Sequence, residues 1–193
     1  DRFRTPEEFI PHNVPLAVLG TMILWTGWYG FNAGSTLSMM DGNAHLAAMV
    51  AVNTTLAASI GGIVTLVLNQ FQSSRWNVPS FLNGALAGLV SITAPCAGVE
   101  PWAAIVIGGV GSALHLIASK ILLHYHIDDP LDAFAVHGVA GIWGTMSVGL
   151  FDKTLGVLYG HSTTFFGWQM VGALTIGVWA FIWSLKTKQY DDL

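Results

Sequence analysis

Six stretches of this chain are long and apolar enough to cross a membrane as helices. Crossing the hydrocarbon core takes about 20 mostly apolar residues in an α-helix. Short polar segments separate the apolar stretches along all 193 residues. The pattern predicts an all-α integral membrane protein with six transmembrane helices, forming a single membrane domain over residues 1–193. We expect the helices at about 14–34, 44–68, 81–97, 101–123, 128–151 and 166–185.

The composition supports this interpretation and excludes several other classes of protein. Charged residues make up 9% of the chain, against about 25% in an average soluble domain. Hydrophobic residues make up 53%, and the mean hydropathy is +0.58. The basic residues are too scattered to favour nucleic-acid binding. The single cysteine, Cys96, excludes an intrachain disulfide framework and a cysteine-based zinc site.

The distribution of Lys and Arg predicts how the chain lies in the membrane. Six crossings place both termini on one side, and cytoplasmic loops carry an excess of positive charge. With this arrangement six basic residues fall on the side of the termini and one, Lys153, falls on the other. We therefore expect both termini in the cytoplasm. The six are Arg2, Arg4, Arg75, Lys120, Lys186 and Lys188.

Two further patterns concern local structure. Asp128, Asp129 and Asp132 surround Pro130 at the start of the fifth stretch, where proline and carboxylates suit a helix N-terminus, so we interpret all three as capping residues. Glycine pairs three or four residues apart place small side chains on one helix face, where they favour close helix packing. These pairs are Gly30 and Gly34, Gly84 and Gly88, Gly108 and Gly111, and Gly141 and Gly144.

His137 is the polar residue most suggestive of function. It lies well inside the fifth stretch among apolar or small neighbours, and ionisable residues at membrane depth are costly and usually functional. Burial predicts a neutral imidazole, which offers one hydrogen-bond donor and one acceptor to a small polar molecule. The alternative is a histidine that only hydrogen-bonds a neighbouring helix. His115 lies deep in the fourth stretch without an ionisable neighbour at close helical spacing, and we predict a structural hydrogen bond for it.

A second constellation lies on the first stretch. Trp28, Phe31 and Ser35 are spaced by three and then four residues, so they share one helix face near the outer end. An aromatic face attracts a cation, and a hydroxyl accepts a hydrogen bond from an N–H donor. The three side chains could therefore recruit a small ammonium-like ion. The alternative is an aromatic belt at the membrane interface with a serine at the helix end.

Three segments resemble signatures of the ammonium transporter (Amt/Mep/Rh) family, and more closely those of its Amt branch. They are residues 27–35 (GWYGFNAGS), 83–90 (NGALAGLV) and 128–139 (DDPLDAFAVHGV), in the family's order and spacing. Residues 11–15 (PHNVP) match the stretch before the first of them. The resemblance covers nearly the whole chain.

The resemblance implies a fold with eleven spans, in which two five-helix repeats of inverted topology enclose one pore per subunit of a homotrimer. The chain is similar to spans six to eleven, the second repeat plus the final helix. By position, His137 matches the second histidine of the pore pair, Phe31 a gate phenylalanine, and Ser35 the serine that hydrogen-bonds the recruited ion. Trp28 matches a pore-lining tryptophan and Ala133 a small apolar pore position.

The departures from the family pattern limit what this chain can do. The first pore histidine, the vestibule tryptophan and the other gate phenylalanine belong to the first repeat and have no counterpart here, nor does the usual cytoplasmic regulatory tail. The chain starts without Met or a signal peptide, so we interpret it as a piece of a longer product that supplies one wall of a pore.

The resulting hypothesis is transport of ammonium or ammonia through a hydrophobic pore in the plasma membrane. The expected partners are the substrate, the lipid bilayer, two further subunits and a cytoplasmic regulatory protein, without nucleic acid. We expect no cofactor, no metal site and no enzymatic activity, since no nucleophile–base pair or metal cluster occurs at workable spacing. An ammonium sensor of the same fold and a non-conducting fragment are the alternatives.

Overall fold

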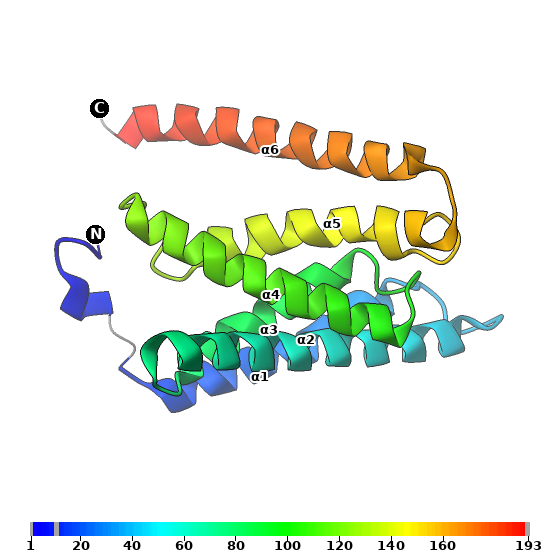
Figure 1. The fold of residues 1–193 in the computed structure, drawn as a ribbon, viewed down its shortest axis with the longest axis horizontal. Helices are drawn as coiled ribbons and strands as arrows, with labels where there is room; N and C mark the ends of the chain where they lie inside the picture. The colour runs from blue at the N-terminus through cyan, green and yellow to red at the C-terminus, as the bar shows by residue number, and fades with distance from the viewer. Residues whose placement is uncertain (1, 10–11, 192–193) are drawn as a thin grey trace.

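The chain is all-helical over the residues that the structure describes, which confirms the predicted fold class. This computed structural model describes residues 2–9 and 12–191, without the side chains of Pro6 and of 186–191. Pro11, in the motif before the first helix, lies outside them. The helices are η1 (Pro6–Phe9), α1 (Val14–Gly34), α2 (Asn43–Ser73), α3 (Val78–Thr93), α4 (Pro101–His124), η2 (Phe134–Val139), α5 (Ala140–Phe151), η3 (Val157–Tyr159) and α6 (Thr163–Asp191), as Figure 1 shows.

Helices occupy all six of the predicted stretches. Five helical segments are long and apolar enough to cross a membrane: α1, α2, α4, the combined segment Phe134–Phe151, and α6. The sixth, α3, has only 16 residues, or about 24 Å at 1.5 Å per residue, which is shorter than the hydrocarbon core. α3 is also the most enclosed, because it packs against α1, α2, α4, α5 and η2.

Asparagine side chains determine where two of the helices begin. The Asn13 side chain accepts a hydrogen bond of 2.9 Å from the backbone N–H of Leu16 at the start of α1. Asn77 accepts one of 3.0 Å from the N–H of Ser80 at the start of α3. Both helices also have proline in their first two positions, where its missing N–H costs nothing. The first turn of each helix is therefore specified locally.

Small residues bring α2, α3 and α4 into backbone contact. A Cβ added to Gly88 would lie 2.2 Å from the carbonyl oxygen of Ala57, and one added to Gly108 would lie 2.4 Å from the same oxygen. Gly84 meets the Thr65 side chain in the same way. The prediction of close packing is confirmed for these glycines. Gly30 and Gly34 have no atoms within 4 Å of an added Cβ, so this pair mediates no packing within the chain.

The fifth helix begins later than predicted, and only one of the three aspartates caps it. Its first backbone N–H groups, those of Ala133 and Phe134, donate to the Asp129 carboxylate at 2.8 and 2.9 Å. Asp128 instead accepts from the backbone N–H of Arg2. Asp132 has a left-handed backbone (φ 55°), which ends the turn after Pro130 rather than continuing a helix. The capping interpretation was therefore wrong for Asp128 and Asp132.

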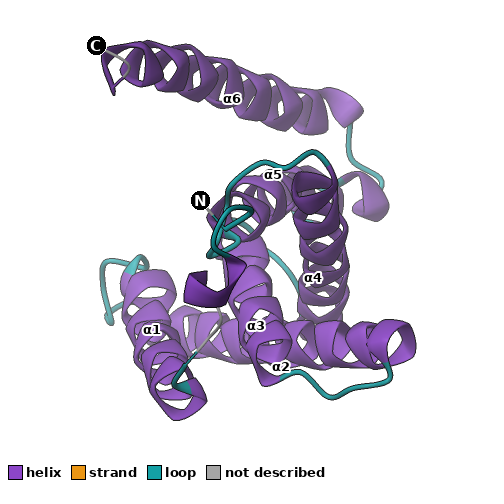
Figure 2. Cartoon of the chain, turned by 90° about the vertical axis from the view of Figure 1, so that its left-hand side faces the viewer, coloured by secondary structure: helices purple, strands orange, loops and turns teal. Residues whose placement is uncertain are grey.

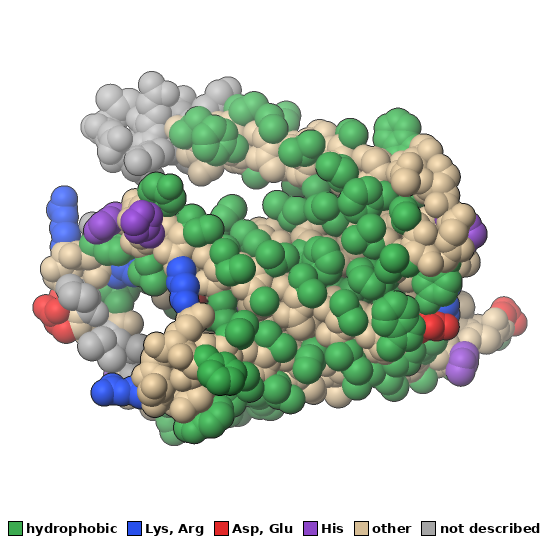
Figure 3. Space-filling view, viewed as in Figure 1, with side chains coloured by type: hydrophobic (Ala, Val, Ile, Leu, Met, Phe, Trp, Pro, Cys, Tyr) green, Lys and Arg blue, Asp and Glu red, His purple; other side chains and the backbone are tan. Residues whose placement is uncertain are grey.

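α6 stands apart from the rest of the bundle and packs only along α5 among the described elements (Figure 2). The two helices meet near Gly149, where an added Cβ would lie 2.7 Å from the Cα of Phe166. Both termini lie at the same end of the molecule (Figure 1). On the face in Figure 3, most of the Lys and Arg side chains gather at that end. The side chains of Lys186 and Lys188 lie outside the described residues.

Candidate functional site

The aromatic residues of the first constellation form an open surface near the C-terminal end of α1. The rings of Trp28 and Phe31 meet edge to face, with centroids 6.3 Å apart and an interplanar angle of 81°. The indole Nε1–H of Trp28 donates to the hydroxyl of Thr93 on α3 at 2.9 Å, which fixes the orientation of the ring. Phe31 is 60% exposed. One ring is thus held by α3 and the other is open to a bound group.

Ser35 follows directly after α1, one helical turn beyond Phe31. Its hydroxyl donates to the carbonyl oxygen of Phe31 at 2.6 Å, and the residue is exposed. A hydroxyl that donates its only proton to the backbone keeps oxygen lone pairs that can accept from an N–H donor. The arrangement therefore suits a small cation that donates hydrogen bonds and faces aromatic rings.

His137 lies on η2, a π-helical turn that the sequence did not predict. π-helical turns are rare and occur frequently at functional sites. Within this chain His137 is exposed, on a face that no described element covers, and it lies in the segment Phe134–Phe151, which is long and apolar enough to cross a membrane. Among the described residues, no side chain hydrogen-bonds the imidazole. Ala133, also exposed, precedes η2 and is tied to Asp129 through its backbone N–H.

α3 connects the two groups of candidate residues. It packs against α1, which carries Trp28, Phe31 and Ser35, and against η2, which carries His137. No hydrogen bond or ring contact within the described part of the chain joins the α1 group directly to His137. The predicted residues therefore lie in two groups without a direct hydrogen bond or ring contact between them among the described residues, one at the end of α1 and one at η2.

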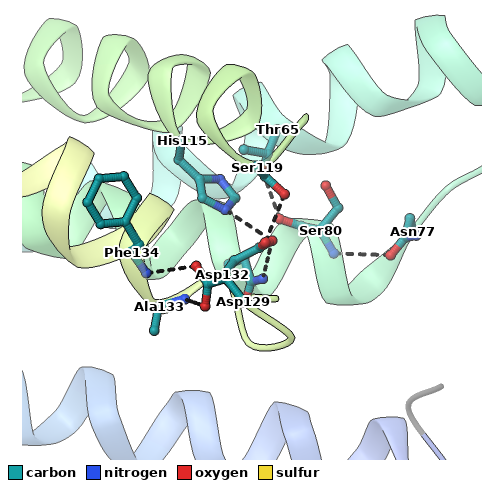
Figure 4. Close-up of polar contacts among 10 residues, drawn as sticks. Thr65, Asn77, Ser80, His115, Ser119, Asp129, Asp132, Ala133 and Phe134 are labelled. Carbon is teal, nitrogen blue, oxygen red and sulfur yellow. Dashed lines mark hydrogen bonds and ion pairs between the residues drawn. The ribbon is translucent and has the colours of Figure 1, made fainter. Parts of the chain in front are cut away.

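A partly buried polar cluster beside η2 was not predicted from the sequence. The Asp132 carboxylate accepts hydrogen bonds from Ser119 Oγ at 2.8 Å and from Asn83 Nδ2 at 3.4 Å, and it lies 3.6 Å from His115 Nε2 (Figure 4). The side chain of His115 is 2% exposed and that of Asp132 is 20% exposed. His115 therefore has an ionisable neighbour outside its own helix, and neither of its ring nitrogens makes the predicted structural hydrogen bond among the described residues. The four-residue spacing of His115 and Ser119 on α4 was the only sequence signal for it.

Comparisons with known proteins place these features in a family context. The model of the Ammonium Transporter Family matches residues 1–187. The chain is 37% identical to the ammonium transporter Amt2 of Archaeoglobus fulgidus over an alignment of 199 positions, gaps included. The alignment covers 94% of this chain and 42% of that protein. The crystal structure of Saccharomyces cerevisiae Mep2 matches with a TM-score of 0.79 and 34% identity, over 88% of this chain and 41% of that chain.

A solved structure of a sensor Amt protein is similar as well. Its TM-score is 0.81 and its identity is 38%, over 88% of this chain and 42% of that chain. The chain thus spans about two-fifths of the length of each of these relatives.

Proposed function

The chain belongs to the ammonium transporter family, and from that premise we propose that it forms one wall of a pore that conducts ammonium across the plasma membrane. The observation that carries the proposal is the exposed imidazole of His137 on an otherwise apolar membrane-spanning segment. A polar side chain that faces away from the bundle at membrane depth is costly unless another polar group passes or faces it. Such a side chain fits the wall of a substrate path.

Selection of the ion would take place at the end of α1. The Phe31 and Trp28 rings offer π faces to a cation. The Ser35 oxygen can accept a hydrogen bond from one N–H group of that cation. Ammonium is small, is positively charged and donates four hydrogen bonds, so it satisfies both kinds of contact. A potassium ion of similar size cannot donate a hydrogen bond to Ser35, which would favour ammonium over potassium.

Passage beyond the rings would require the ion to transfer its proton to a water molecule at the mouth of the pore. An unpaired charge is expensive in an apolar environment, whereas neutral ammonia carries no such penalty. Ammonia leaving the α1 site would then exchange hydrogen bonds with the His137 imidazole, which offers a donor and an acceptor when neutral. The apolar wall thus excludes ions, and the histidine supplies the polar contact that the neutral molecule needs.

The rest of the assembly is part of the same proposal. α1, η2 and α6 expose apolar faces. We assign the contacts of these faces to the first half of the pore and to lipid. The complete subunit would form a homotrimer. Both termini of the chain would lie in the cytoplasm, where a regulatory protein could bind. The single Lys153 on the opposite side supports this orientation.

Substitution of His137 tests the proposal directly. We expect His137→Ala, made in the protein as its gene encodes it, to change both the rate of ammonium uptake and the discrimination between ammonium and methylammonium. Uptake would be measured in cells that lack their own ammonium transporters. His124→Ala, which removes an exposed histidine at the end of α4, serves as the matched control and should transport normally. Unchanged rate and selectivity in His137→Ala would refute the pore role.

A sensor of ammonium is the second candidate function, favoured by the similarity to the solved sensor Amt protein. A sensor would bind the ion at the end of α1 and change the state of a partner with little flux. The same uptake assay separates the two functions. Robust ammonium uptake supports a transporter, whereas ion binding without uptake supports a sensor.

A further inference from the structure

His137 depends on its backbone for its position. No side chain among the described residues hydrogen-bonds the imidazole, so the position of the ring depends on the backbone of η2 rather than on a hydrogen bond. A π-helical turn has i→i+5 hydrogen bonds and is rare in proteins, where it appears mostly as a single turn within an α-helix. Whatever fixes the start of η2 therefore also fixes the place of the ring in the pore wall.

Two carboxylates meet the start of η2, and they act on different parts of the structure. The Asp129 carboxylate stays local and caps the N–H groups of Ala133 and Phe134. The Asp132 side chain points the other way, toward α3 and α4 (Figure 4). Its own carbonyl oxygen accepts from the N–H of Val136 at 2.8 Å, which joins Asp132 directly to η2. Asp132 thus adds a polar connection to the packing of η2 against α3 and α4.

The backbone of Asp132 would not hold this place by itself. A left-handed conformation is unfavourable for residues other than glycine, although aspartate and asparagine tolerate it best. The carboxylate offsets that cost through its contacts with Ser119 and His115 on α4 and with Asn83 on α3. These contacts stabilise the left-handed backbone of Asp132, which the local sequence alone would not favour.

The carboxylate is ionised at neutral pH. Burial opposes its ionisation, but His115, Ser119 and Asn83 together hold the pKa of Asp132 below its ordinary value. A charged carboxylate accepts stronger hydrogen bonds than a neutral one. The hydrogen bonds that the Asp132 carboxylate accepts from Ser119 and Asn83 are therefore charge-assisted at neutral pH.

We propose that Asp132, held by Ser119, His115 and Asn83, is the positioning residue that sets the place of His137 in the pore wall. This inference rests on the proposed pore role of His137. Asp132 itself does not touch the substrate. Asp132 lies five residues before His137 and acts on it through the backbone of η2.

Asp132→Asn tests this role because it removes the charge and keeps the size of the side chain. We expect the maximal rate of ammonium transport to fall about tenfold and the ammonium-to-methylammonium ratio to change. The half-saturating concentration should stay unchanged, because the ion-selecting residues lie on α1. Asp128→Asn is the matched control, since Asp128 lies next to the capping residue Asp129 and its carboxylate accepts from the backbone N–H of Arg2.

Two further variants separate positioning from loss of folding. Ser119→Ala removes the 2.8 Å hydrogen bond and keeps the carboxylate, so it should show the same change more weakly even if Asp132→Asn fails to reach the membrane. In a His137→Ala background, Asp132→Asn should cause no additional change, because the residue it positions is gone. An equal loss in both backgrounds would overturn the proposal.

A measurement that does not depend on transport completes the test. Hydrogen–deuterium exchange of the peptide that contains 134–139 should be faster in Asp132→Asn than in the wild type and in Asp128→Asn. Unchanged exchange together with unchanged transport would refute the role of Asp132. If the wild-type protein conducts no ammonium, the proposed function fails, and the exchange rates alone decide whether Asp132 supports η2.

Discussion

The direction of the Ser35 hydroxyl is set by the backbone of its own helix. Its proton is directed to the carbonyl oxygen of Phe31, so its oxygen is an acceptor in the absence of any substrate. The sequence predicted that Trp28, Phe31 and Ser35 share a face, because that follows from helical spacing. It could not predict the bond from Trp28 to Thr93, which joins residues 65 positions apart.

Ser35→Ala should weaken ion recruitment without abolishing transport. A hydrogen bond to a charged group contributes about 1.5 kcal/mol at the lower end of its range, which corresponds to a rise of roughly tenfold in the half-saturating ammonium concentration. The concentration dependence of ammonium uptake measures this value. Thr26→Val is the matched control, because Thr26 also donates to its own helix, at Met22, but lies outside the predicted face. A similar rise in both variants would argue against a specific contact at Ser35.

Among the elements, α3 and η2 differ most from what the sequence predicted. The hydrophobic pattern located both stretches, but it placed α3 a few residues late and began the fifth helix at Asp128. The true start depends on Asp129 capping Ala133 and Phe134, and on Asp132 reaching α3 and α4. The latter contacts join residues far apart in sequence, so no local pattern indicates them.

Gly88→Ala should destabilise the contact between α3 and α2. The added methyl would lie 2.2 Å from the Ala57 carbonyl oxygen, so the helices must separate, at a cost of about 2–3 kcal/mol. Unfolding of the protein in mixed micelles, followed by circular dichroism, measures the difference in stability. Gly20→Ala is the control, since nothing lies within 4 Å of the added methyl there. Equal stability of the two variants would contradict the proposed backbone contact.

At the scale of the whole molecule, the chain has a well-packed side and an open side. The buried core joins α2, α3, α4 and α5, and its residues include Val50, Ile92, Ile107 and Phe151. In contrast, α1 and α6 expose many large apolar side chains, among them Leu19, Ile23, Trp168 and Trp179. An apolar surface of this extent requires lipid or further protein. It agrees with a chain that spans about two-fifths of the length of its relatives.

The proposed orientation predicts which loops can be labelled from outside the cell. Cys96 is buried, so single added cysteines should react against a low background. We expect Lys153→Cys to react with a membrane-impermeant maleimide in intact cells. Arg75→Cys, which is exposed at the opposite end of the bundle, should react only after the cells are opened. The reverse pattern would mean that the charge distribution does not set the orientation of this chain.

The sequence by itself determined the class of the protein, the positions of six apolar helices and the residues that carry the family resemblance. These features depend on hydrophobicity, helical periodicity and local motifs, which a single chain displays directly. Only the tertiary structure decided that His137 faces outward, that η2 is a π-helical turn, and that Asp132 contacts His115, Ser119 and Asn83. Those features arise from contacts between helices, and the energy of such contacts depends on which surfaces meet in three dimensions.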